Sequence, residues 1–220
     1  MMTTSTLTVT AGVEPKRIAG LDALTAIEQR RSVKHYDANF VMPEEDAKTL
    51  LQLAMLSPTS FNMQNWRFVW VQNAEKREAL KAAAWGQSQV TDASIVLLLC
   101  ANLNAATTNP ERYWSLAPQA VQEMIVPMLG QFYTDNPTLQ RDEAMRSIGI
   151  AAQTLMVATK AMGYDSCPMV GYDPTKVAEI INLPEDHVIG MMLTIGKAVQ
   201  PAKARSGQLP YEEVIIVDNF

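Results

Sequence analysis

Three cations and one hydroxyl occur within five residues of the sequence, in the segment Arg30-Arg31-Ser32-Val33-Lys34. An extended backbone would place alternate side chains on one side, so that Arg30, Ser32 and Lys34 face the same ligand. Guanidinium binds phosphate in a fork, ammonium acts as a point charge, and a serine hydroxyl adds a neutral donor. The pattern therefore predicts an anion site. The alternative interpretation is a solvated basic loop, because the helix macrodipole favours cations just after a helix C-terminus.

Composition narrows the class of protein. A chain of 220 residues that is 48% hydrophobic fits one domain with a sizeable core. The net charge of −5 argues against a nucleic-acid partner, whose binding surface is usually basic. Two cysteines and two histidines far apart give no metal-ligand pattern. Residues 1–20 lack the pattern of a signal peptide and no run of about 18 apolar residues occurs, so we expect a cytoplasmic protein without membrane contact.

Periodicity and capping signals predict the elements that position the basic segment. Residues 1–20 are expected to be a flexible N-terminal segment, followed by a single domain over residues 21–220. Helices are expected over residues 22–29, 43–56, 75–84, 138–162 and 174–181, and strands over residues 67–72, 94–101, 188–195 and 211–217. Strands separated by helices indicate an α/β or α+β domain.

The remaining segments are less regular. Residues 102–136 are expected to form only short helical pieces, broken by prolines such as Pro127. Residues 164–173 are expected to form a loop in which Cys167 is more exposed than the other cysteine. Gly149, inside the longest helical pattern, predicts another helix packed closely against it.

Three further segments carry clustered polar residues. Residues 57–66 (SPTSFNMQNW) precede the first strand, residues 168–172 (PMVGY) follow the longest helix, and Lys203 and Arg205 lie in a second basic loop. Taken alone, the first could be a simple helix-to-strand turn and the last a solvated loop.

Together and in this order, these segments resemble the nitroreductase family of FMN-dependent oxidoreductases. The matching pieces are R-R-S-x-K, S-P-T-S-x-N-x-Q-x-W before the first strand, P-M-x-G-Y-D after the long helix, and K-x-R before the terminal strand. The resemblance covers roughly residues 21–217. Many members have proline before the tryptophan, where this chain has Asn65, a difference expected to alter a turn.

The resemblance implies a fold and an assembly. We expect an α+β domain in which a mixed, mostly antiparallel sheet is surrounded by helices. Members form an intertwined homodimer with two FMN molecules at the subunit interface. In such proteins the C-terminal strand, here residues 211–217, crosses over to the partner's sheet, which fits a terminal strand that needs an edge to pair with.

The resemblance also implies roles for individual residues. Arg30, Ser32, Lys203 and Arg205 are expected to hold the FMN phosphate, and Lys34 to stabilise the negative charge that appears on the reduced flavin. The other residues expected around the flavin are Arg31, Pro58, Ser60, Asn62, Gln64, Gln87, Pro168, Met169, Val170 and Gly171.

Some of these carry more specific expectations. Pro58, Ser60 and Asn62 should come from the other subunit. The backbone of Gly171 should lie near flavin N5, where close approach leaves no room for a Cβ. Gln87 is expected at the pyrimidine edge.

The activity implied is that of an FMN-dependent NAD(P)H oxidoreductase. NADH or NADPH would serve as a transient hydride donor in a ping-pong mechanism, with nitroaromatics, quinones or similar electron-poor small molecules as acceptors. The sequence offers no obvious protein acid or base and no Rossmann fingerprint. The alternatives are another flavin reaction, such as enoyl or ene reduction or dehalogenation, or a non-catalytic flavin-binding protein. A purely structural α/β dimer would bind no FMN.

Overall fold

A four-stranded antiparallel sheet organises the chain. The structure is a computed structural model that describes residues 20–220, so the expected N-terminal segment lies, except for Gly20, outside the described residues. The strands are β1 (Trp66–Trp70), β2 (Ile95–Asn102), β3 (Asp165–Met169) and β4 (His187–Gly196), in the spatial order β1-β2-β4-β3. Each neighbouring pair is antiparallel, and the parallel contact found among the described residues is an isolated bridge between Ser32 and Ser166.

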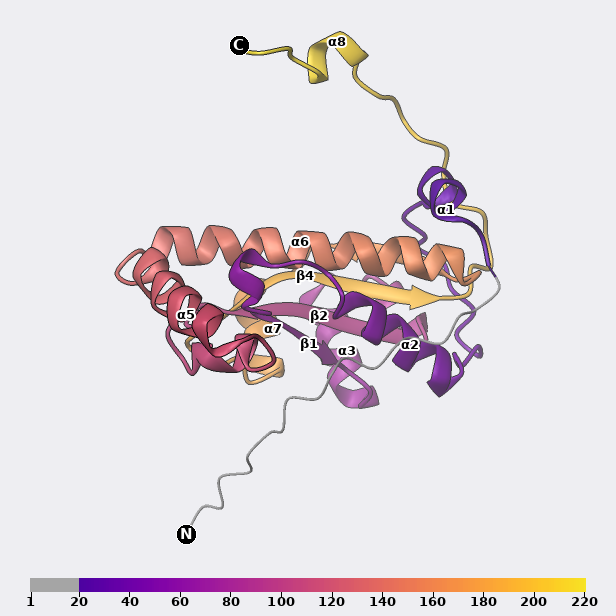
Figure 1. Ribbon diagram of the computed structural model, residues 1–220. Helices are drawn as coiled ribbons and strands as arrows, with labels where there is room; N and C mark the ends of the chain where they lie inside the picture. The colour runs from indigo at the N-terminus through magenta and orange to yellow at the C-terminus, as the bar shows by residue number, and fades with distance from the viewer. Residues whose placement is uncertain (1–19) are drawn as a thin grey trace.

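Helices cover both faces of this sheet. One face packs against α2 (Glu44–Ala54) and the long α6 (Pro137–Ala161), and the other against α3 (Ala74–Ala83), α4 (Gln89–Asp92) and α7 (Pro174–Ile180). Figure 1 shows α6 lying along the sheet, with α3 and α7 on the opposite side. β2 sends alternate side chains into each core, which explains why its sequence is apolar throughout. The expected α+β class is therefore confirmed.

The remaining helices lie around the ends of the sheet. They are α1 (Ala23–Gln29), the 3-10 turns η1 (Ser60–Asn62) and η2 (Pro110–Trp114), α5 (Gln119–Tyr133) and α8 (Tyr211–Val214). Figure 1 places α5 and α1 at opposite ends of α6. Within the described part of the chain, no helix is both long and apolar enough to cross a bilayer.

Several expectations for local structure were wrong. The predicted loop over residues 164–173 contains strand β3, in which Cys167 is buried. Pro168 is tolerated there because β3 is an edge strand, where a missing N–H need not disrupt a ladder. Helix α5 continues through Pro127, held by Leu129 and Tyr133, whose side chains are buried.

Two further corrections concern surfaces. Gly149 on α6 faces outward, and a Cβ added there would meet no atom within 4 Å, so no helix within residues 20–220 packs against it. Within residues 20–220, the expected strand over residues 211–217 does not form: residues 211–214 form α8, and no described strand pairs with the segment. Its expected exchange to a partner's sheet stays a prediction. In Figure 1 the chain leaves the body of the molecule after passing α1 and ends beyond α8. Extended backbone becomes a strand only when it finds an edge to pair with.

Candidate functional site

The two basic segments of the sequence meet in one cleft of about 390 Å³. They are separated by about 170 positions in the chain, and the fold alone brings them together. The predicted residues that line the cleft are Arg30, Arg31, Ser32, Lys34, Lys203 and Arg205. The lining also includes residues that the sequence reading missed, which are His35, Gln200, Pro201, Ala202, Ala204 and Ser206. Their adjacency to the basic motifs was the one signal that could have identified them.

Backbone pairing holds the first basic segment in place. Helix α1 begins at its N-cap Asp22 and ends at Arg30, and the chain then becomes extended. The N–H of Val33 donates to the carbonyl of Ser166 at 3.0 Å, beside strand β3. Val33 itself is 3% exposed and packs in a small apolar cluster with Tyr36. With Val33 turned inward, the residues on either side of it are left to face the cleft, as expected for an extended backbone.

The second basic segment is paired with the first. The N–H of Asp37 donates to the carbonyl of Lys197 at 2.9 Å, and the N–H of Val199 donates to the carbonyl of His35 at 3.0 Å. These bonds follow directly after β4 and fix where residues 200–205 begin. The cleft is therefore built from two loops, each anchored to the sheet by main-chain hydrogen bonds.

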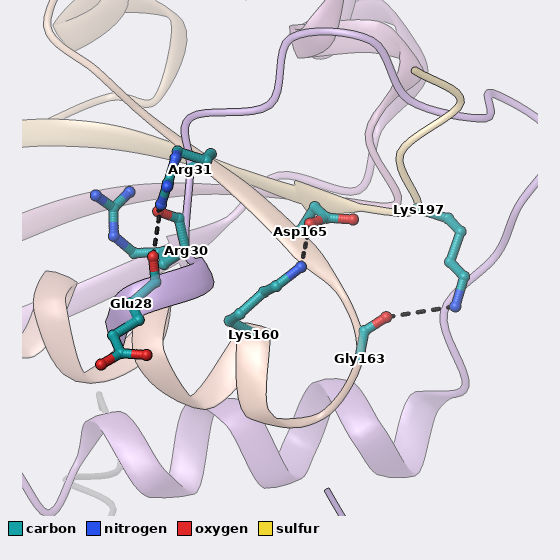
Figure 2. Close-up of polar contacts among 7 residues, drawn as sticks. All are labelled: Glu28, Arg30, Arg31, Lys160, Gly163, Asp165 and Lys197. Carbon is teal, nitrogen blue, oxygen red and sulfur yellow. Dashed lines mark hydrogen bonds and ion pairs between the residues drawn. The ribbon is translucent and has the colours of Figure 1, made fainter. Parts of the chain in front are cut away.

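The guanidinium groups of the two arginines in the first motif make different contacts. The guanidinium of Arg31 donates to the carbonyl oxygens of Glu28 at 2.7 Å and of Arg30 at 2.9 Å. Figure 2 shows Arg31 turned back on the end of α1, whereas the guanidinium of Arg30 points away and makes no contact with the residues drawn. Arg31 thus satisfies carbonyls at a helix C-terminus, and Arg30 keeps its donors for a ligand.

Positive charge is concentrated in the cleft, and none of the described residues that line it is acidic. Among residues 20–220, no ion pair engages Arg30, Lys34, Lys203 or Arg205. Burial, followed by repulsion from Arg205 and Arg31, lowers the pKa of Arg30. Nearby, the ammonium of Lys160 and the carboxylate of Asp165 form an ion pair with each other at 3.1 Å (Figure 2). A cationic cleft in a chain of net charge −5 is a site that an anion would stabilise.

The second group of predicted residues lies elsewhere. Pro58, Ser60, Asn62 and Gln64 do not line the cleft. Ser60 and Asn62 bond to α5 and η2, near the end of α6 opposite to α1 (Figure 1). Ser57, which precedes Pro58, bonds instead to Thr154 of α6, closer to the α1 end. Within one copy of this chain, Ser60 and Asn62 are therefore set apart from the cleft along α6.

This loop has an unusual backbone. Phe61, Asn62 and Gln64 adopt φ values of 51°, 53° and 42°, in the left-handed region. Such a conformation costs an L-residue other than glycine about 1–2 kcal/mol, although asparagine tolerates it better. Strain of this kind persists only where surrounding contacts enforce it.

The third group is assembled around the end of β3. The side-chain amide of Gln87 donates to the carbonyl of Gly171 at 2.8 Å and to that of Ala84 at 3.1 Å. Its oxygen accepts from Gln89 at 3.0 Å, so the amide of Gln87 is occupied by protein partners and ties Gly171 in place. A Cβ on Gly171 would come within 3.3 Å of the ring of Trp85.

The other members of this group point in different directions. Pro168 lies within β3, opposite Leu193 of β4. The side chain of Met169 is buried in the core that faces α3 and α7, so only its backbone is available to a ligand. Val170 is 74% exposed.

Comparison with known proteins gives one consistent picture. Residues 27–197 match the sequence model of the Nitroreductase family. Protein DrgA of Synechocystis sp. is 46% identical over 200 residues, which cover 89% of this chain and 95% of that protein. The provisionally named NAD(P)H nitroreductase YodC of Bacillus subtilis is 34% identical over 197 residues, covering 88% and 97%. A provisionally named nitroreductase of Exiguobacterium sibiricum, crystallised in complex with FMN, has a TM-score of 0.82 at 28% identity, covering 91% of this chain and 99% of that one.

The charge of the cleft leads to a first prediction. Inorganic phosphate should raise the thermal unfolding temperature of the ligand-free protein at constant ionic strength, because it binds the folded state. At ten times its dissociation constant, phosphate would add about 1.4 kcal/mol of stability. Replacing both Arg30→Ala and Arg205→Ala should abolish this shift.

The matched control removes the same charge elsewhere. Lys48→Ala combined with Lys176→Ala deletes two surface cations that pair with neighbouring acids on their own helices, outside the cleft. This variant should keep the full phosphate response. An equal loss of response in both double variants would mean that phosphate acts on net charge and not on the cleft.

Proposed function

The chain belongs to the nitroreductase family, and on that premise we propose that it is an FMN-dependent NAD(P)H oxidoreductase that reduces nitroaromatics, quinones or similar electron-poor acceptors. The observation that carries this proposal is the cleft in which Arg30, Lys203 and Arg205 meet with no acidic partner from residues 20–220. A cluster of cations and hydroxyls suits the phosphate of a mononucleotide. Bound FMN would supply the redox chemistry, taking hydride from NADH or NADPH and passing electrons to the acceptor in a ping-pong cycle.

The residues present fit an FMN phosphate. Arg30 offers a guanidinium fork that no acceptor among residues 20–220 occupies, Ser32 a neutral donor, and Lys203 and Arg205 two further charges. Main-chain bonds fix the segment of Arg30 and Ser32 and the start of the loop that carries Lys203 and Arg205, so less ordering is left to offset binding. We assign these four residues to the phosphate.

Lys34 has a separate role in this proposal. It lines the same cleft two residues beyond Ser32, so an FMN held by its phosphate would extend past the ammonium group. A fixed cation beside the flavin favours the reduced, negatively charged form over the neutral oxidised form. Lys34 would therefore raise the reduction potential of the cofactor.

The proposed site is completed by a second copy of the chain. Ser60 and Asn62 lie towards the far end of α6 from the cleft, and none of Pro58, Ser60, Asn62 and Gln64 lines it, which supports this loop's facing the FMN held by a partner subunit. Residues beyond the cleft support the same assembly. Leu209, Tyr211, Val214, Ile215, Ile216, Val217 and Phe220 are all exposed apolar residues on the segment that leaves the body of the molecule. A run of this kind needs a surface to cover it.

The end of β3 would lie against the flavin. Gly171 is held by Gln87 and overlain by Trp85, so its backbone position is fixed. We propose that Pro168, Val170 and Gly171 present backbone groups to the isoalloxazine edge, and that Gln87 acts by holding Gly171 in place.

Absorption spectroscopy gives the most direct test of the proposed function. The purified protein, supplied with FMN, should show flavin bands that bleach within seconds of anaerobic addition of NADH or NADPH. The bands should return on addition of a quinone or nitroaromatic. Bands that resist both donors would indicate a non-catalytic flavin-binding protein, and absence of FMN binding would refute the proposal.

The role of Lys34 can be measured as a potential. Lys34→Ala should lower the two-electron midpoint potential of bound FMN by tens of millivolts, where 30 mV corresponds to about 1.4 kcal/mol. Lys197→Ala is the matched control, because Lys197 donates to the carbonyl of Gly163 and stands outside the cleft (Figure 2). A potential that is unchanged or higher in Lys34→Ala would contradict this role.

The proposed dimer predicts an effect of charge in the C-terminal segment. Replacing Ile215→Asp together with Ile216→Asp should raise the dimer dissociation constant at least about tenfold, because an interface would have to bury unpaired carboxylates. Sedimentation equilibrium measures this directly. Glu212→Ala with Glu213→Ala changes the same segment without adding a charge and should leave the dimer intact. Equal dimerisation of the Ile215/Ile216 variant and wild type would exclude this segment from the interface.

A further inference from the structure

The strained η1 loop is tied to a distant part of the chain by its own backbone and amide groups. The indole N–H of Trp114 donates to the carbonyl of Phe61 at 2.9 Å. The side-chain amide of Asn62 donates to the carbonyl of Tyr113 at 2.9 Å. Both partners belong to η2, about fifty positions further along the chain. η2 therefore hydrogen-bonds to the loop at Phe61 and Asn62, two consecutive residues with positive φ values.

A third bond reaches the same loop from α5. The phenol of Tyr133 donates to the hydroxyl oxygen of Ser60 at 2.8 Å. The ring of Tyr133 also meets Phe61 edge-on, with ring centroids 6.3 Å apart. Burial raises the pKa of the Tyr133 hydroxyl, so it stays protonated and remains a donor at physiological pH.

The direction of this bond decides what Ser60 can do. A hydroxyl has one hydrogen and two acceptor positions. Because Ser60 accepts from Tyr133, its own hydrogen is left to be donated outward. An oriented hydroxyl is a better donor than a freely rotating one, since the orientation is fixed before the ligand binds.

We propose that Tyr133 and Trp114 are positioning residues for the cofactor site: Tyr133 orients Ser60 as a hydrogen-bond donor, and Trp114 holds the strained backbone at Phe61. The inference rests on the proposed function, in which the η1 loop faces the FMN of the partner subunit. It assigns to residues 110–133, which bond to the loop and not to the cleft, an influence on FMN affinity exerted through the loop. A substitution in that segment that alters acceptor specificity would therefore also alter FMN affinity.

Conservative substitutions test this directly. Tyr133→Phe and Trp114→Phe each remove one donor and keep an aromatic ring. Each should weaken FMN binding by roughly 2- to 10-fold, the effect of one lost hydrogen bond. Titration of FMN with the ligand-free protein, followed by flavin fluorescence, measures the affinity. The visible circular dichroism of bound flavin should change as well, because the loop beside it moves.

Two matched controls remove the same groups elsewhere. Tyr164→Phe deletes a hydroxyl that bonds to Asp46, away from the loop. Trp70→Phe deletes an indole N–H that is buried without a hydrogen-bond partner among the described residues. Both should leave FMN affinity and the flavin spectrum unchanged. Thermal unfolding of all four ligand-free variants shows whether any of them is merely destabilised.

A double-mutant cycle separates positioning from general structural support. If Tyr133 acts through Ser60, then Tyr133→Phe should weaken FMN binding in the wild-type background and have no further effect in a Ser60→Ala background. Independent, multiplicative effects would overturn the inference, as would Tyr133→Phe and Trp114→Phe variants that bind FMN like their controls. Wild-type protein that does not bind FMN would instead refute the proposed function itself, and this inference with it.

Discussion

The structure depends on a short stretch of main-chain pairing beside the sheet. Val33 donates to Ser166 next to β3, and residues 35–37 exchange bonds with residues 197–199 after β4. These bonds collect cations from two distant segments into one cleft, where their charges repel each other. Main-chain bonds and a buried apolar anchor, formed by Val33 and Tyr36, can oppose that repulsion because neither depends on charge. These contacts thus hold the cations of the cleft in place before an anion binds.

The length of α6 sets the second constraint. This helix lies between the basic cleft, beside α1, and the part of the η1 loop that bonds to α5 (Figure 1). In the proposed function, a site that uses both draws one half from each of two subunits. The outward-facing Gly149 and the exposed apolar residues of the C-terminal segment fit the same proposal, since both are surfaces that no described residue covers.

Strain and support occur together at the η1 loop. Phe61, Asn62 and Gln64 hold left-handed backbone angles that the local sequence does not favour. Hydrogen bonds with Trp114, Tyr113 and Tyr133, all outside the loop, enforce that conformation. A loop held in this way can present side chains in a fixed geometry, at the cost of depending on residues far along the chain.

Local signals in the sequence were sufficient for the elements that depend on neighbouring residues. The capped helix at Asp22, the buried strand β2 and the long helix α6 follow from capping and periodicity. The order of four short motifs was enough to identify the family.

The other features depend on contacts between segments that are distant in the chain. Pro168 could join a strand because β3 lies at an edge, whereas residues 211–217 leave the body of the molecule and pair with neither edge of the described sheet (Figure 1). Arg30 and Arg31 look alike in the sequence, yet only the fold shows that Arg31 is used on the carbonyls of α1. Likewise, Gln87 proved to be bonded to Gly171, a partner 84 positions away. Local sequence fixes what a side chain can donate or accept, but its partner is chosen by contacts between segments that are distant in the chain.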